Sequence, residues 1–243
     1  MKLIDDILST LDLDTSVKDL CQGPFQTAVL TRNCGLAATP HELGYHQNKA
    51  PVSDAGYLLE KEVSELAQMA QSPNLSEAAI GMATINSLLD IDERCCVDVN
   101  GADLLVDKGR GKEIVLIGHF PFVPKLRQAA KCLWVIERQP VEGDVDETEA
   151  ENIVPRADVV GITGSAFVNH TIEHLLTLCN SDAYIVILGA TTPFSPVLFD
   201  YGVNAISGTK VVESELVLRY VSQGATFRQL RGIHLLTMMK ERR

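Results

Sequence analysis

The sequence from residue 113 onward most constrains the fold, because short apolar segments alternate there with segments of helical spacing. The predicted strands are 113–118, 132–136, 159–162, 183–188 and 205–206, and the predicted helices are 123–130, 168–179, 194–201 and 211–221. Repeated strand-helix units form parallel sheets through right-handed crossovers. This part of the chain therefore predicts a Rossmann-like, three-layer domain built on a parallel sheet.

The first part of the chain has few strands and more local helices, which predicts a small α+β domain. An amphipathic helix is expected over 2–11, a hairpin of strands over 25–32 and 35–39, a helix over 56–71, and a further helix capped by Ser76. The composition changes between residues 92 and 101. We therefore predict one domain over 1–98 and a second over 99–243.

The charge balance argues against a nucleic-acid partner. The 243 residues carry a formal net charge of -11, whereas proteins that bind nucleic acids need basic patches to neutralise phosphates. No apolar run reaches the ~18 residues that a membrane span requires, and Asp5 and Asp6 interrupt the place where a signal peptide would be apolar. We expect a cytoplasmic protein with no membrane partner.

Unusual residues follow four of the predicted strands. They are Gly118 and His119 after the first strand, Glu137 and Arg138 after the second, Thr163, Gly164 and Ser165 after the third, and Thr192 and Pro193 after the fourth. The carboxyl ends of parallel strands share one edge of a sheet, where ligands bind. We therefore expect these residues to converge on one site. Singly, each has a simpler interpretation as a helix cap, a surface ion pair or a turn glycine.

Several other motifs have weaker interpretations. Neither G-x-G-x-x-G nor G-x-x-x-x-G-K-[ST] occurs after a strand, so no nucleotide cofactor is expected. His170 and His174 fit the H-x-x-E-H pattern of inverted zinc peptidases, but no third ligand is evident. His41 and His46 could belong to a loop that folds over the site or to an ordinary solvated loop. An acidic run over 142–151 could attract cations, or it could be a solvated loop that leads into a helix.

The motifs at the strand ends resemble a known family. The sequences G-H-F-P at 118–121, E-R at 137–138, A-D-V-V-G-I-T-G-S-A-F-V-N-H-T at 157–171 and L-G-A-T-T-P-F-S-P at 188–196 are similar to those of the prokaryotic "putative heavy-metal chelation" family. That family combines an enolase-amino-terminal-like domain with a Rossmann-like domain. The resemblance implies a cleft between the two domains and a role with metals or metal chelates. The matching positions are Gly118, His119, Glu137, Thr163, Gly164, Asn169, Thr171, Thr192 and Pro193.

Our hypothesis is a protein that binds a metal ion or a small metal chelate between its domains. His119 and Glu137 would be ligands of a divalent transition metal, while amides and hydroxyls of Gly164, Ser165, Asn169 and Thr171 would face an anionic chelator. One alternative is a small-molecule enzyme that uses Glu137 or His119 as general acid or base; another is a regulatory protein with a vestigial cleft. A homodimer is a further expectation.

Overall fold

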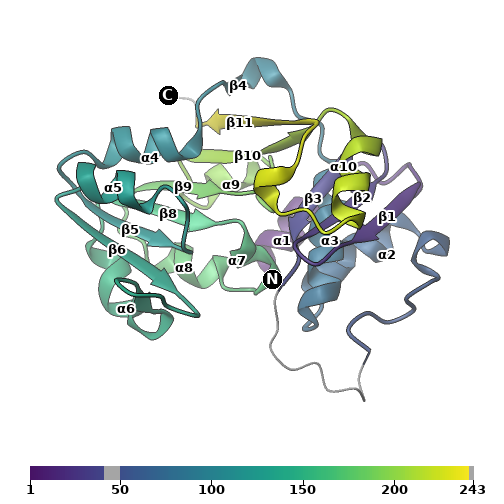
Figure 1. The fold of residues 1–243 in the computed structure, drawn as a ribbon, viewed down its shortest axis with the longest axis horizontal. Coiled ribbons are helices and arrows are strands. Elements are labelled where there is room, and N and C mark those ends of the chain that lie inside the picture. Colours follow the sequence, from purple (N-terminus) through teal and green to yellow (C-terminus); the bar gives the residue numbers. More distant parts are fainter. Residues whose placement is uncertain (41–49, 241–243) are drawn as a thin grey trace.

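A computed structural model describes residues 1–40 and 50–240 as two sheets with surrounding helices (Figure 1). Its strands are β1 (Asp19–Gln22), β2 (Gln26–Leu30), β3 (Cys34–Ala38), β4 (Cys96–Val97), β5 (Glu113–Ile117), β6 (Cys132–Glu137), β7 (Val145–Asp146), β8 (Val159–Thr163), β9 (Tyr184–Leu188), β10 (Ala205–Val211) and β11 (Ile233–Met239). Its α-helices are α1 (Lys2–Leu8), α2 (Val63–Gln68), α3 (Leu75–Leu88), α4 (Gly101–Gly109), α5 (Val123–Ala129), α6 (Ala150–Ile153), α7 (Ser165–Val168), α8 (Ile172–Leu178), α9 (Val197–Asp200) and α10 (Ser214–Ser222).

The larger sheet has eight strands in the order β4, β11, β10, β9, β8, β5, β6, β7. The six neighbouring strands from β10 to β7 are parallel, whereas β11 runs antiparallel to both β10 and β4. From β5 the chain builds outward through β6 and β7, then returns to the other side of β5 and continues through β8, β9 and β10. The direction of winding therefore reverses between β5 and β8, and such a switch point opens a crevice at the carboxyl ends of the strands.

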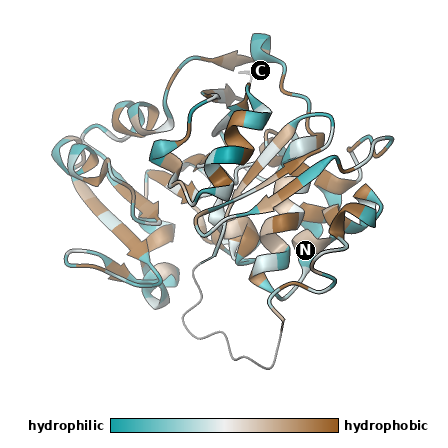
Figure 2. Ribbon diagram, turned by 45° about the vertical axis from the view of Figure 1, so that its right-hand side comes forward, coloured by the Kyte–Doolittle hydropathy of each residue, from teal (hydrophilic) through white to brown (hydrophobic). Residues whose placement is uncertain are grey.

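Helices cover both faces of the larger sheet, which gives the three layers that the sequence predicts. Leu104 and Leu105 on α4 and Leu126 on α5 pack against one face, and α6, α8 and α9 cover the other. The central strands β5, β8 and β9 are mostly apolar because they are buried on both sides (Figure 2). The prediction of a Rossmann-like α/β fold is confirmed.

The smaller sheet consists of β1, β2 and β3, all antiparallel. Helix α3 lies directly on it: a Cβ added to Gly35 would stand 2.1 Å from the carbonyl oxygen of Ala83, so only glycine permits this approach. The opposite face, which includes Ala28 and Leu36, is covered by Val217 and Val221 of α10. A helix from the last part of the chain thus completes the core of the first part (Figure 1).

The structure confirms the predicted hairpin, the first helix and the five predicted strands after residue 113. Other details were wrong: the first helix ends at Leu8 and not at residue 11, and the helix expected over 194–201 spans only Val197–Asp200. Asn74, not Ser76, caps α3, since its side chain accepts a hydrogen bond from the Ser76 amide at 3.0 Å. The helix expected over 56–71 is divided, with only 63–68 forming an α-helix between 3₁₀ turns. The helix expected over 168–179 begins at Ile172, because His170 adopts a φ of 64°.

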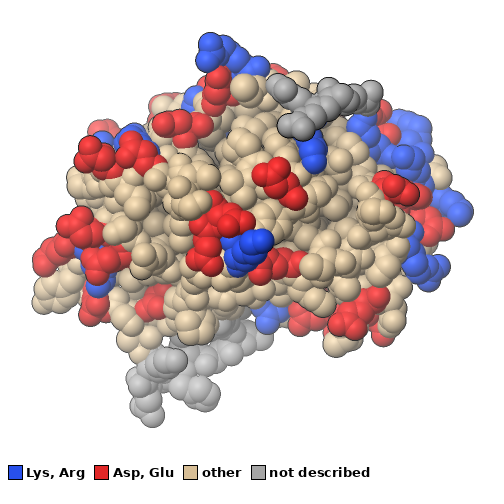
Figure 3. Space-filling view, turned by 180° about the vertical axis from the view of Figure 1, so that it is seen from behind, with Lys and Arg blue, Asp and Glu red and all other residues tan. Residues whose placement is uncertain are grey.

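Strand β4 precedes residue 98 and nevertheless pairs with β11 in the larger sheet. The division at 98 and 99 stays a prediction. Within the described parts of the chain, no helix combines the length and apolar character needed to cross a membrane. Acidic side chains are spread over the face opposite to that of Figure 1, and basic side chains gather mainly toward one edge, among acidic ones (Figure 3).

Candidate functional site

The turns after β5 and β8 meet at the switch point. Gly118 has a φ of +97°, and a Cβ at this position would lie 3.1 Å from Cβ of Thr163. The Gly118 amide also donates to the carbonyl of Ile136 at the end of β6, at 2.8 Å. Glycine is therefore required for both the backbone conformation and the close approach. These contacts fix the ends of three adjacent strands relative to one another.

His119 and Glu137 lie together at this edge, as the sequence predicts for neighbouring parallel strands. The backbone amide of His119 donates to Oε2 of Glu137 at 2.9 Å, and Oε1 accepts from the amide of Arg138 at 2.8 Å. A carboxylate has about four acceptor positions, and these bonds occupy two of them. Arg138 pairs with Glu147 at 3.4 Å.

The imidazole of His119 is held by a residue that sequence reasoning missed. Its Nδ1 lies 2.8 Å from Oδ2 and 3.0 Å from Oδ1 of Asp144, in the connection between β6 and β7. The Asp144 side chain is 1% exposed, whereas that of His119 is 41% exposed. Asp144 belongs to the acidic run over 142–151. The sequence did contain a signal for this contact. Asp144 follows β6, and the connection after β6 starts from the same edge of the sheet as the turn that carries His119.

The turns after β8 and β9 form the other half of the predicted site, and this half is largely buried. A Cβ on Gly164 would lie 2.6 Å from both the amide nitrogen and Oγ1 of Thr192. Thr192 is 2% exposed and Pro193 is also buried. The smaller sheet covers this turn, since the Ala38 amide donates to Oγ1 of Thr191 at 2.8 Å. The predicted residues thus lie along the carboxyl edge of the larger sheet. Solvent reaches this edge at His119, after β5, whereas Thr192, after β9, is buried.

Asn169 and Thr171 form a local turn between α7 and α8. Oδ1 of Asn169 accepts from the amide of Thr171 at 3.2 Å and from its hydroxyl at 2.7 Å. This Asx-type turn stops α7 and allows α8 to begin in a new direction. Ser165 is half-buried, and its amide donates to Oγ1 of Thr163 at 3.3 Å. The structure therefore gives Asn169 and Thr171 a shaping role, and contact with a ligand remains a prediction for both.

The H-x-x-E-H histidines do not form a pair. His170 Nε2 donates to the carbonyl of Ala70 at 3.2 Å, while His174 lies on α8, where its Nε2 is 3.7 Å from Oε1 of Glu151. The two imidazoles have different partners, which argues against the peptidase geometry. His41 and His46 lie outside the described residues.

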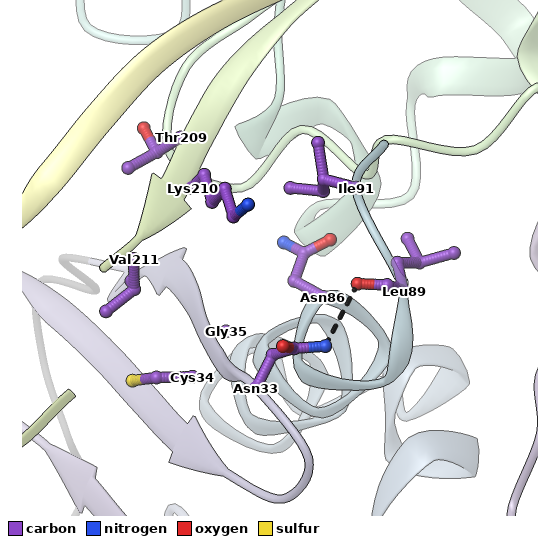
Figure 4. Close-up of a pocket in the computed structure, with 9 residues that line it drawn as sticks. All are labelled: Asn33, Cys34, Gly35, Asn86, Leu89, Ile91, Thr209, Lys210 and Val211. Carbon is purple, nitrogen blue, oxygen red and sulfur yellow. Dashed lines mark hydrogen bonds between the residues drawn. The ribbon is translucent and has the colours of Figure 1, made fainter. Parts of the chain in front are cut away.

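A cavity of about 30 Å³ lies between the two sheets, at the end of β10 (Figure 4). Asn86 and Thr209 line it, and the Asn86 Oδ1 and Thr209 Oγ1 atoms have no hydrogen-bond partner among residues 1–40 and 50–240. The cavity has room for about one or two water molecules, too little for a metal chelate. Cys34 also lines it, and burial raises the pKa of this thiol to about 12, so the thiol is protonated at neutral pH. A larger groove of about 300 Å³ lies away from the predicted site, beside Lys2 and Tyr201.

The fold and site define a class: α/β proteins in which a Rossmann-like sheet meets an α+β unit at its carboxyl edge. The chain belongs to the family described as putative heavy-metal chelation. The DUF4213 model of that description matches residues 4–89, and the DUF364 model matches residues 100–240.

The chain is also similar to three individual proteins from bacteria and archaea. An uncharacterized protein from Methanocaldococcus jannaschii is 25% identical over 183 residues, which are 72% of this chain and 70% of that protein. A DUF364-family protein of unknown function from Desulfitobacterium hafniense has a solved structure with a TM-score of 0.84 and 25% identity, covering 98% of both chains. A DUF364-family structure from Pyrococcus horikoshii, also of unknown function, has a TM-score of 0.82 at 23% identity, again over 98% of each chain, and supports the fold.

Proposed function

We propose that the protein binds a small chelate of a divalent transition metal at the carboxyl ends of β5, β6 and β8. The observation that carries the proposal is the adjacency of His119 and Glu137 at the switch point, linked by a 2.9 Å hydrogen bond, with the imidazole 41% exposed. An imidazole nitrogen and a carboxylate oxygen together suit borderline metals such as Ni²⁺, Co²⁺ and Zn²⁺.

The number of protein ligands favours a chelate over a bare ion. Among residues 1–40 and 50–240, no three His, Cys, Asp or Glu side chains are grouped so that they could hold a metal ion. Sites that retain a bare zinc ion use three or four protein ligands. A chelator supplies most of the ligands itself and leaves only one or two coordination positions for the protein. His119 and Glu137 would fill these positions, and the half-buried hydroxyls of Thr163 and Ser165 would contact the chelator.

The proposal is tested with nickel nitrilotriacetate, a chelate that leaves two coordination positions open. Untagged protein is titrated with this chelate and, separately, with free Ni²⁺, and binding is followed by calorimetry and native mass spectrometry. We expect a one-to-one complex with the chelate, tighter than with the free ion. The complex should be lost in His119→Ala and weakened in Glu137→Gln.

His174→Ala is the matched control, because it removes another exposed imidazole that lies on α8 beside Glu151. This variant should bind the chelate as the wild type does. Wild-type affinity in a protein carrying both His119→Ala and Glu137→Gln would overturn the assignment, as would a wild-type protein that binds neither probe.

A second candidate is a small-molecule enzyme, favoured by one observation. The contact between His119 and a buried carboxylate is an arrangement that orients a general base. The discriminating experiment incubates a metabolite extract with wild-type protein and with His119→Ala. A metabolite consumed only by the wild type would favour catalysis over binding.

A further inference from the structure

Asp144 differs from the other acids of its run because its carboxylate is enclosed. Its side chain is 1% exposed, while Asp146 accepts from the amide and hydroxyl of Thr148 at the surface. Burial of a charged group is costly unless it is paired and hydrogen-bonded. The partners of Asp144 are the His119 ring, at 2.8 and 3.0 Å, and the Val141 amide at a longer 3.3 Å. The ring is thus the principal partner that compensates this burial.

The local backbone keeps Asp144 in this place. The Asp144 amide donates to the carbonyl of Val141 at 2.9 Å, which closes a tight turn, and Gly143 within it has a φ of +90°. On the opposite side, the backbone of His119 is fixed by its bond to Glu137. One carboxylate therefore holds the main chain of His119 and another holds its ring. A side chain secured at both ends loses little further freedom when it binds a ligand.

We propose that Asp144 is a positioning residue that selects the Nδ1–H tautomer of His119 and thereby leaves the Nε2 lone pair open to the metal of the bound chelate. A carboxylate accepts hydrogen bonds and donates none, so the proton must lie on Nδ1. In a neutral imidazole the other nitrogen then carries the lone pair. Histidines that ligate metals commonly donate their second nitrogen to a carboxylate in this way. The consequence for binding rests on the proposed function, whereas the choice of tautomer does not.

The tautomer is measured directly by long-range ¹H–¹⁵N correlation spectra of histidine-labelled protein at a pH where His119 is neutral. His119→Gln identifies the signals. We expect an unprotonated Nε2 in the wild type. Asp144→Leu removes the acceptor of the Nδ1–H bond, so the proton should shift toward Nε2, and affinity for nickel nitrilotriacetate should fall by about 10–100-fold. Asp146→Asn, which changes the same charge in the same run without touching His119, should alter neither quantity.

The possible outcomes separate this inference from the proposed function. A wild-type spectrum with the proton on Nε2 overturns the inference without any variant, as does an unchanged tautomer in Asp144→Leu. A changed tautomer with unchanged chelate affinity overturns the positioning role in binding. If the tautomer changes as expected but the wild type binds no chelate, the selection by Asp144 stands and the proposed function fails. Unchanged signals from His170 and His174 verify that the variant remains folded.

Discussion

Gly164→Ala tests the contact that holds the turns after β8 and β9 together. Gly164 has a φ of -58° and a ψ of -21°, a conformation open to any L-residue, so backbone strain does not complicate the result. The added methyl would lie 2.6 Å from the amide nitrogen and Oγ1 of Thr192. Ordinary contact begins at 3.4 Å, so the turn would have to move by about 0.8 Å.

The magnitude follows from two opposing effects. Overpacking of a well-packed site costs about 1–3 kcal/mol, and the lower entropy of the unfolded alanine variant offsets about 0.4–1 kcal/mol. The midpoints of these ranges give an expected net loss of about 1.3 kcal/mol in the free energy of unfolding. Urea unfolding followed by circular dichroism should show a lower midpoint with an unchanged slope.

Two further variants make this experiment decisive. Ser165→Ala, at the next position, should change stability by no more than about 0.5 kcal/mol. Adding Thr192→Ala to Gly164→Ala removes the Oγ1 contact but not the contact with the backbone nitrogen, so it should restore part of the loss. A midpoint for Gly164→Ala equal to or above that of the wild type would refute the steric argument.

The remaining predictions concern buried polar groups and thiols. Thr192→Val should stabilise the fold by about 1 kcal/mol in urea unfolding. The buried Oγ1 has no hydrogen-bond partner within the described part of the chain, and valine has nearly the same shape as threonine; a loss of stability would reveal an unseen hydrogen bond. Asn86→Ala should destabilise by about 1–3 kcal/mol, because its amide donates to carbonyls of β3 and of the turn after β9; an unchanged midpoint would contradict that link. Burial raises the pKa of Cys34 and Cys179 to about 12. Iodoacetamide at pH 8 should therefore modify exposed Cys95 but neither buried thiol in the folded protein, and mass spectrometry should detect modification of Cys34 and Cys179 only after unfolding.

The larger fold could be predicted because buried parallel strands are continuous apolar runs, and β5, β6, β8 and β9 all have that pattern. Strands that lack it were missed. β1 is short, half-exposed and bounded by Asp19 and Gln22, so its pattern is not apolar. β11 extends the sheet antiparallel, with exposed His234 and Leu235 beside buried residues, and this pattern differs from that of a two-sided buried strand.

The candidate site could be predicted in part for a similar reason. The edge of a parallel sheet brings strand ends together irrespective of loop details, which accounts for the contact between His119 and Glu137. The burial of Thr192 depends on how the smaller sheet packs against the larger one, and no local pattern encodes that packing. The role of Asp144 depends on a tight turn that returns toward His119, so the acidic run alone could not distinguish it from its solvated neighbours.

The cover that α10 forms over the smaller sheet has a consequence for synthesis of the protein. Residues 26–38 form a hairpin, and one of its apolar faces is covered by Val217 and Val221. These two residues are synthesised almost two hundred residues after the hairpin. Until those residues leave the ribosome, the emerging chain has α3 on one side of the sheet and an uncovered surface on the other. The amino-terminal part should therefore reach its final stability only at the end of translation, and interruption of synthesis before α10 should leave a product that chaperones and proteases recognise.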